Sequence, residues 1–149
     1  MKPPVRVTET AVLLRVVVAD QGISVNDSLT ALLSEFEGLS VLGCVQEPAK
    51  ILALARSVRP DVVILDLETG HPTDWDTLRQ VKRLPGAPVV IVLTHYDLPP
   101  VRRAARAAGA DHCLVKATEC GRLQEILQAM IGQRGKTKPR KEQTDSGRP

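Results

Sequence analysis

Four apolar runs in this sequence each end in a residue that can bind a cation or a phosphoryl group: Asp20, Asp66, Thr94 and Lys116. Two carboxylates held close together favour a bound cation, because otherwise one of them must keep its proton. Mg²⁺ held by carboxylates commonly also takes phosphate oxygens. A lysine and a threonine hydroxyl nearby would complete a phosphate cradle. These residue types therefore suggest phosphoryl transfer to a carboxylate, with an aspartyl phosphate as the covalent product.

The run Val62–Leu65 before Asp66 is apolar on both faces, and three of its four residues are β-branched. Such a run is typical of a central parallel strand that helices cover on both sides. Four other stretches predict strands: 12–19, 40–45, 89–93 and 111–115. Segments with helical spacing of apolar residues lie between them, and prolines or glycines mark where several of these helices begin or end.

Five units of strand followed by helix predict an α/β fold with a parallel sheet and right-handed crossovers. The flavodoxin-like order for five strands is 2-1-3-4-5, a three-layer (βα)5 sandwich with its switch point between strands 1 and 3. This order brings Asp20 and Asp66 side by side, with Thr94 and Lys116 at the ends of strands 4 and 5. The ligand-binding edge of such a sheet is the one at which the strands end.

The 149 residues fit one domain, and aromatic residues make up only 2% of them, which argues against nucleic-acid binding by base stacking. The net charge is +3, but the basic residues gather in the segment 132–149, which has no apolar periodicity. We predict an N-terminal extension (1–11), a mildly acidic domain (12–131) and a disordered basic tail (132–149). The lack of a signal peptide or a membrane-spanning run, and three cysteines without CxxC spacing, predict a cytoplasmic protein with reduced thiols.

Four stretches in this order carry a family resemblance: Arg15-Val16-Val17-Val18-Ala19-Asp20, Arg59 to Leu67, Val90 to Thr94, and Ala108 to Lys116. Over about residues 15–130 the chain resembles a response-regulator receiver domain (CheY-like) of the NarL/FixJ type. The resemblance implies that Asp66 accepts a phosphoryl group from a sensor histidine kinase or a phosphotransfer protein. It implies that Asp20 lies near Mg²⁺, that Thr94 bonds the phosphoryl group and that Lys116 neutralises it.

The resemblance also implies a two-component signalling protein that is not an enzyme beyond self-phosphorylation and dephosphorylation at Asp66. We expect this protein to contact a downstream protein through about residues 99–131. The resemblance is also compatible with a homodimer. We expect a stand-alone receiver that does not bind DNA directly, because no helix-turn-helix follows in the sequence.

The sequence departs from the family pattern at several site positions. The family's second acid, usually the direct metal ligand, falls on Gln21, and Glu68 follows Asp66 where the family lends a backbone carbonyl to the metal. His95 stands where a small residue usually leaves access, and Cys113 occupies the position of the aromatic switch. Because a neutral glutamine removes one charge, we expect weakened Mg²⁺ binding.

Several alternative interpretations remain open at this stage. The fold could serve as a pseudo-receiver, an interaction module that acts without phosphorylation. Asp66-Leu67-Glu68-Thr69 also resembles the first motif of proofreading-type exonucleases, but that motif needs further acids well downstream. The three histidines (His71, His95 and His112) show no metal-ligand spacing and are expected in loops or at the surface. Cys113 is expected to be a small core residue, with redox sensing as the alternative.

Overall fold

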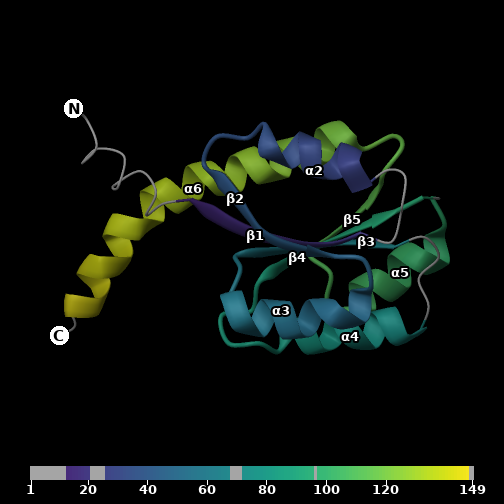
Figure 1. The fold of residues 1–149 in the computed structure, drawn as a ribbon. Helices are drawn as coiled ribbons and strands as arrows, with labels where there is room; N and C mark the ends of the chain where they lie inside the picture. The colour runs from purple at the N-terminus through teal and green to yellow at the C-terminus, as the bar shows by residue number, and fades with distance from the viewer. Residues whose placement is uncertain (1–12, 21–25, 68–71, 96, 148–149) are drawn as a thin grey trace.

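The structure is a computed structural model and describes residues 13–20, 26–67, 72–95 and 97–147 (Figure 1). Five parallel strands form one sheet in the order β2-β1-β3-β4-β5. The strands are β1 (Leu14–Asp20), β2 (Leu39–Val45), β3 (Val62–Leu67), β4 (Val89–Thr94) and β5 (His112–Val115). The predicted flavodoxin-like fold and strand order are therefore confirmed.

Helices cover both faces of the sheet, as the apolar strands require. Helices α2 and α6 lie on one side in Figure 1, and α3, α4 and α5 lie on the other. The helices are α2 (Asn26–Ser34), α3 (Ile51–Val58), α4 (Pro72–Lys82), α5 (Pro99–Ala108) and α6 (Cys120–Gly147), and a short 3₁₀ helix, η1 (Pro48–Lys50), precedes α3. The three layers follow from burying the strands β1, β3 and β4 on both faces.

Alternate residues of each central strand enter two separate hydrophobic cores. Val63 and Leu65 of β3 pack toward α3, α4 and α5, whereas Val62 and Ile64 pack toward α2 and α6. All four side chains are fully buried. A buried Val, Leu or Ile contributes roughly 1.5–3 kcal/mol relative to an exposed one. Two cores of this kind hold β3 in the middle of the sheet, so the position of Asp66 at its end is rigidly defined.

Prolines and glycines delimit the helices where the sequence predicts it. Pro99 stands in the first turn of α5, where its missing N–H costs nothing. Gly109 ends α5 with a φ of 114°, and its N–H donates to Ala105 and Arg106 carbonyls. A Cβ at this glycine would lie 2.9 Å from Lys82 Cγ, so both its backbone angle and the close helix contact require glycine.

The C-terminal segment differs from its prediction. Helix α6 continues from Cys120 to Gly147, although the sequence predicts disorder from 132 onward. The prediction of disorder rested on the absence of an apolar face in this segment. A helix needs such a face to pack against a sheet. A helix that is already nucleated against the core is extended more easily than a new one is started, and Lys, Arg, Gln and Glu in this segment favour its extension, although Gly132, Gly135 and Pro139 oppose it. In Figure 1 this last part of α6 projects away from the body.

The N-terminal extension (1–11), Val12, Gln21, Glu68 and His71 lie outside the described residues. In the part of the chain that the structure does describe, no helix is long and apolar enough to cross a membrane.

Candidate functional site

Asp20 and Asp66 are paired across the junction of β1 and β3. They stand opposite each other in the strand register, at the end of both strands, and each is 1% exposed. The order β2-β1-β3 makes these strands neighbours, although 45 residues lie between Asp20 and Asp66 in the sequence. The parallel sheet thus brings together two carboxylates that the sequence predicts to meet, in a position closed to bulk water.

Lys116 supplies the cation of this site. It follows the last residue of β5, and its Nζ donates a hydrogen bond to Asp66 Oδ2. Its backbone N–H donates to the carbonyl of Thr94 at 2.8 Å, which ties the end of β5 to the end of β4. The Lys116 side chain is 18% exposed, so the ammonium reaches the buried carboxylate from the surface.

Burial raises the pKa of Asp66 to about 6, from an ordinary value of 3.8. The hydrogen bond and charge of Lys116 oppose this rise, and the carboxyl group of Asp20 adds to it. At neutral pH Asp66 is therefore mostly a carboxylate, yet one that is poorly stabilised. Its Oδ1 is buried and has no hydrogen-bond partner among the described residues. An under-stabilised carboxylate with an uncommitted oxygen has the chemistry of either a nucleophile or a ligand for a cation.

Thr94 ends β4 and is 4% exposed. It stands opposite Leu67 of β3, one residue past Asp66, and opposite Val115 of β5, one residue before Lys116. The predicted hydroxyl group thus belongs to the same sheet edge as the two acids and the lysine.

The donor set fits a hard cation in part. Asp20 and Asp66 offer two buried carboxylates, and Asp66 Oδ1 lacks another partner within the described residues. No group of three or more His, Cys, Asp or Glu side chains that could hold a metal ion occurs among the residues described. Mg²⁺ does not require such a group, because it keeps several waters and is often held by one or two carboxylates plus phosphate oxygens. The predicted ligands Gln21 and Glu68 lie outside the described residues.

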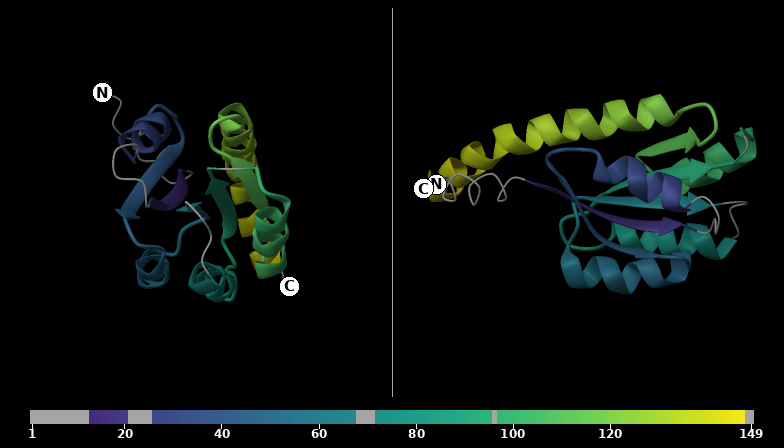
Figure 2. Two further views of the ribbon diagram at one scale, coloured as in Figure 1. Left: turned by 90° about the vertical axis from the view of Figure 1, so that its right-hand side faces the viewer. Right: turned by 45° about the horizontal axis from the view of Figure 1, so that its top comes forward.

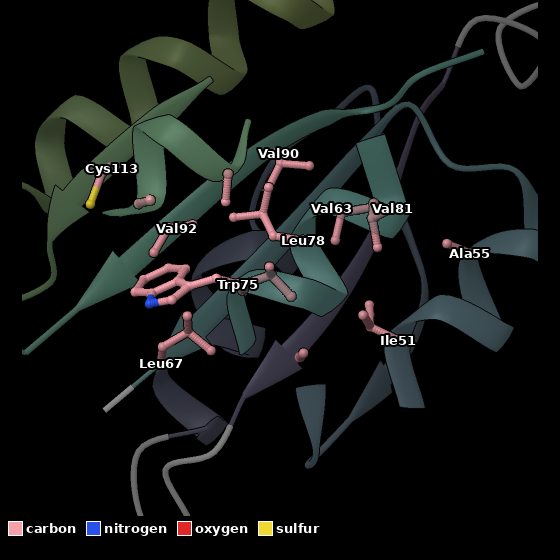
Figure 3. Packing of buried hydrophobic residues seen from close by; sticks show 14 of the residues in the cluster. Ile51, Ala55, Val63, Leu67, Trp75, Leu78, Val81, Val90, Val92 and Cys113 are labelled. Atoms are coloured by element: carbon pink, nitrogen blue, oxygen red, sulfur yellow. The ribbon is translucent and has the colours of Figure 1, made fainter. Parts of the chain in front are cut away.

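Of the residues that depart from the family pattern, Cys113 lies in the core as the sequence predicts, whereas Gln21 and Glu68 lie outside the described residues. Cys113 is 6% exposed and packs in the core of the α3, α4 and α5 face, which also contains Val92 and Trp75 (Figure 3). It is therefore a small core residue, and burial is the main reason that the pKa of its thiol is raised. His95 and His112 are half-buried. In the described part of the chain every peptide bond is trans, including the one after Lys116.

Arg102 and Glu119 form a network that the sequence does not predict. Arg102 Nη2 donates to Glu119 Oε1 at 3.0 Å, its Nη1 donates to the carbonyl of Cys113 at 2.8 Å, and its Nε donates to Asp97 at 2.8 Å. The same Glu119 oxygen accepts the backbone N–H of Val115 at 2.7 Å, which holds the pKa of Glu119 below its ordinary value. This network, the Arg102 clasp, ties α5 to the strand and loop that carry Lys116.

The sequence profile of the response regulator receiver domain matches residues 16–128. The chain belongs to the response regulator receiver domain family. The sequence resemblance is thereby confirmed, and receiver domains typically bind Mg²⁺ at an acidic pocket.

Two curated relatives are longer than the matched region, so the match covers only part of each of them. The chain is 28% identical over 120 residues to protein-glutamate methylesterase/protein-glutamine glutaminase 1 of Caulobacter vibrioides, covering 79% of this chain and 35% of that protein. It is 29% identical over 123 residues to response regulator GacA of Pseudomonas aeruginosa, covering 82% of this chain and 58% of that protein. The chain thus spans between about a third and three fifths of these relatives.

Solved structures confirm the fold. The signal receiver domain of the putative response regulator NarL from Mycobacterium tuberculosis superposes with a TM-score of 0.69 at 23% identity, covering 80% of this chain and 97% of that chain. A LuxR-family two-component response regulator from Aurantimonas sp. SI85-9A1 gives a TM-score of 0.71 at 21% identity, covering 82% of this chain and 87% of that chain. At this identity the likeness concerns the fold alone.

Proposed function

We propose that Asp66 of this receiver accepts a phosphoryl group from a phosphohistidine of a sensor histidine kinase or a phosphotransfer protein. The observation that supports this most directly is the buried Asp66 carboxylate, opposite Asp20 and hydrogen-bonded to Lys116. Receiver domains as a family interact with such donors.

In the proposed step, a carboxylate oxygen of Asp66 attacks phosphorus. The new O–P bond forms as the P–N bond to the donor histidine breaks, and the imidazole leaves with a proton from solvent. Asp66 must be deprotonated to attack, which its pKa of about 6 allows at neutral pH. Lys116 then transfers its hydrogen bond from the carboxylate to a phosphoryl oxygen, and the Thr94 hydroxyl donates to another.

Asp20 and Asp66 would hold Mg²⁺, and the bound ion would offset the charge of the phosphoryl oxygens. Gln21, whose amide oxygen is neutral, would be the third ligand, and Glu68 would contribute its backbone carbonyl. Because one charge is lost at Gln21, we propose that Mg²⁺ binds weakly and that phosphorylation is slow.

The output of the receiver is proposed to be protein–protein contact in the cytoplasm, with no catalysis beyond phosphorylation and dephosphorylation of Asp66. The downstream partner would bind the face built by α5, β5 and the start of α6, about residues 99–131, and the same face could form a homodimer. Direct DNA binding by this chain is not expected.

A pseudo-receiver that works without phosphorylation is the second candidate. The loss of an acid at Gln21 favours it, as does Cys113, which cannot act as an aromatic switch that alternates between buried and exposed positions. In this case the Lys116–Asp66 contact would be a permanent structural pair.

Intact mass after incubation with acetyl phosphate and Mg²⁺ separates the two candidates. The parent chain is compared with Asp66→Asn and with Asp76→Asn, a matched change at an exposed acid of α4. A phosphoryl adduct on the parent chain and on Asp76→Asn, but not on Asp66→Asn, is the expected result. No adduct on any of them, with the Trp75 fluorescence unmoved by beryllofluoride, would rule out the phosphoryl-acceptor function and leave the pseudo-receiver.

A further inference from the structure

A surface groove lies at the end of the sheet where the strands begin, opposite the edge that carries Asp66. Its walls are the C-terminal end of α3 and the turn that leads from α4 to β4. It encloses about 320 Å³ and is lined by Ala55, Arg56, Arg59, Pro60, Leu84, Pro85 and Pro88. In the right-hand view of Figure 2, β1 starts at the left, and its arrow points toward the Asp66 edge at the right. Nothing in the proposed phosphoryl transfer uses this groove.

The charge in the groove is all of one sign. Arg56 and Arg59 are exposed, and no acidic side chain lines the groove. Neither guanidinium has an ion-pair or hydrogen-bond partner among the described residues. A guanidinium presents its N–H groups as a planar fork that matches a carboxylate, so two unpaired arginines three positions apart in the sequence offer two such forks.

The guanidinium groups of Arg56 and Arg59 are not needed to cap α3, although Arg59 is its C-cap residue through its backbone, whose N–H donates to the Ala55 carbonyl. The carbonyl groups of Val58 and Arg59 at the end of this helix accept hydrogen bonds from the guanidinium of Arg15, which reaches them from β1. The usual structural role of basic residues at a helix C-terminus is therefore filled by another side chain. The two groove arginines remain available to a ligand.

Unusual backbone angles shape both walls of the groove. Arg59 has a φ of 51° and Ala87 a φ of 33°, and in the described residues these are the non-glycine positions with positive φ. Each directly precedes a proline of the groove, Pro60 or Pro88. The angle of Arg59 belongs to the left-handed C-cap of α3, whose N–H donates to the Ala55 carbonyl, and it turns the chain sharply into Pro60.

The lining of the groove fits a peptide better than a small molecule. Its apolar surface comes from prolines, Ala55 and Leu84, and no buried polar side chain is present to fix the orientation of a small ligand. A peptide obtains its orientation from its extended backbone and from charges spaced along it.

We propose that this groove docks an extended acidic segment of a partner protein. Carboxylates of the segment pair with Arg56 and Arg59, and an apolar side chain between them covers Pro60 and Pro88. The proposal is independent of phosphorylation at Asp66, and it gives the receiver a second protein-binding surface at the opposite end of the sheet.

The test uses the full chain and a dye-labelled peptide of about seven residues in which Leu and Glu alternate, measured by fluorescence anisotropy. The test variant is Arg56→Glu with Arg59→Asn, because asparagine tolerates positive φ. The matched control is Lys50→Glu with Arg79→Asn, which makes the same change in charge at two exposed basic residues outside both the groove and the 99–131 face. Thermal unfolding confirms that both variants are folded. We expect the groove variant to weaken peptide binding about tenfold or more, and the control to change it less than about twofold.

Three results would overturn the proposal. Equal weakening by the groove variant and the control would mean diffuse attraction to a basic surface. Equal affinity for a peptide with serine in place of leucine, together with displacement by citrate, would mean a simple anion site. No binding of the peptide by the parent chain would mean that the groove does not dock acidic segments.

Discussion

Lys116 Nζ donates a hydrogen bond to Asp66 Oδ2 across an intervening strand, since β4 lies between β3 and β5. The contact joins a carboxylate that is 1% exposed to a lysine side chain that is 18% exposed. Even so, the pKa of Asp66 is raised to about 6, because desolvation outweighs the attraction of the lysine. The surroundings of Asp66 thus stabilise its carboxylate form less well than water does.

Removing the charge of Asp20 should lower the pKa of Asp66. Asp20 raises the pKa of Asp66 through charge repulsion and a side-chain hydrogen bond, and Asp20→Asn removes the charge repulsion, which is the larger of the two effects. The pH titration of the Asp66 carboxyl carbon, followed by ¹³C NMR without Mg²⁺, should show a midpoint below that of the parent chain. The control Asp76→Asn changes an exposed acid that pairs with Arg79, and it should leave the midpoint of Asp66 unchanged. A midpoint that rises in Asp20→Asn would contradict the pairing of the two acids.

The raised pKa of Asp66 should make stability depend on pH in a way that Asp66→Asn lacks. The folded pKa of about 6 lies above the ordinary 3.8, so the native state binds this proton more tightly than the unfolded chain. The contribution to the free energy of unfolding is fully present below about pH 4 and is lost as the pH rises through about 6. Its full size is roughly 3 kcal/mol, because one pKa unit corresponds to about 1.4 kcal/mol.

Urea unfolding with EDTA at about pH 4 and pH 8 measures this effect. Asp66→Asn should be more stable than the parent chain at the higher pH, and the difference should shrink toward zero at the lower pH. Other acids titrate in both proteins and cancel in the comparison. A difference that is constant with pH would show that Asp66 titrates normally.

The main features of the site could be predicted from the sequence because they depend on topology. Asp20 and Asp66 follow apolar runs, and parallel strands end at one edge of the sheet, so their meeting requires no knowledge of side-chain geometry. The burial of Cys113 likewise follows from its position in an apolar strand. Alternate apolar residues of the central strands fill the two hydrophobic cores, so both cores specify the same arrangement of strands.

The Arg102 clasp could not be predicted in this way. Arg102 and Glu119 are 17 positions apart, and neither stands at a strand end or in a recognisable motif. Their contact depends on how α5 packs beside β5 and on the conformations of two long side chains. The sequence likewise does not show that the side chains of Arg56 and Arg59 are unpaired. Only the structure shows that the guanidinium of Arg15 binds the carbonyl groups at the end of α3.

The clasp should stabilise the connection from β5 to α6. Arg102→Met keeps the aliphatic stem but removes the hydrogen bonds to Glu119, Asp97 and the Cys113 carbonyl. We expect a loss of about 1–2 kcal/mol in the free energy of unfolding, since the bonds are charged but partly exposed. Arg79→Met, which breaks only an exposed pair within α4, should cost less than about 0.5 kcal/mol.

Hydrogen exchange locates the effect of this change. The amide of Val115 donates to Glu119, so its exchange should accelerate in Arg102→Met more than that of Val17 in β1. Equal protection of Val115 in the parent chain and the variant would show that the clasp does not order this connection.

Restoring the missing acid should strengthen the metal site. Gln21→Asp puts a third carboxylate directly after Asp20 in the sequence, at the position that the resemblance aligns with the family's second acid, and Mg²⁺ affinity rises with the number of charged oxygen ligands. We expect at least about tenfold tighter Mg²⁺ binding, measured by quenching of Trp75 fluorescence or by calorimetry, and faster labelling of Asp66 by acetyl phosphate. The matched change Gln46→Asp, at an exposed residue after β2, adds the same charge elsewhere and should leave both unchanged. If Gln21→Asp binds Mg²⁺ no better than the parent chain, then the weakness of the site does not come from residue 21, and the register that aligns it with the family's second acid is wrong.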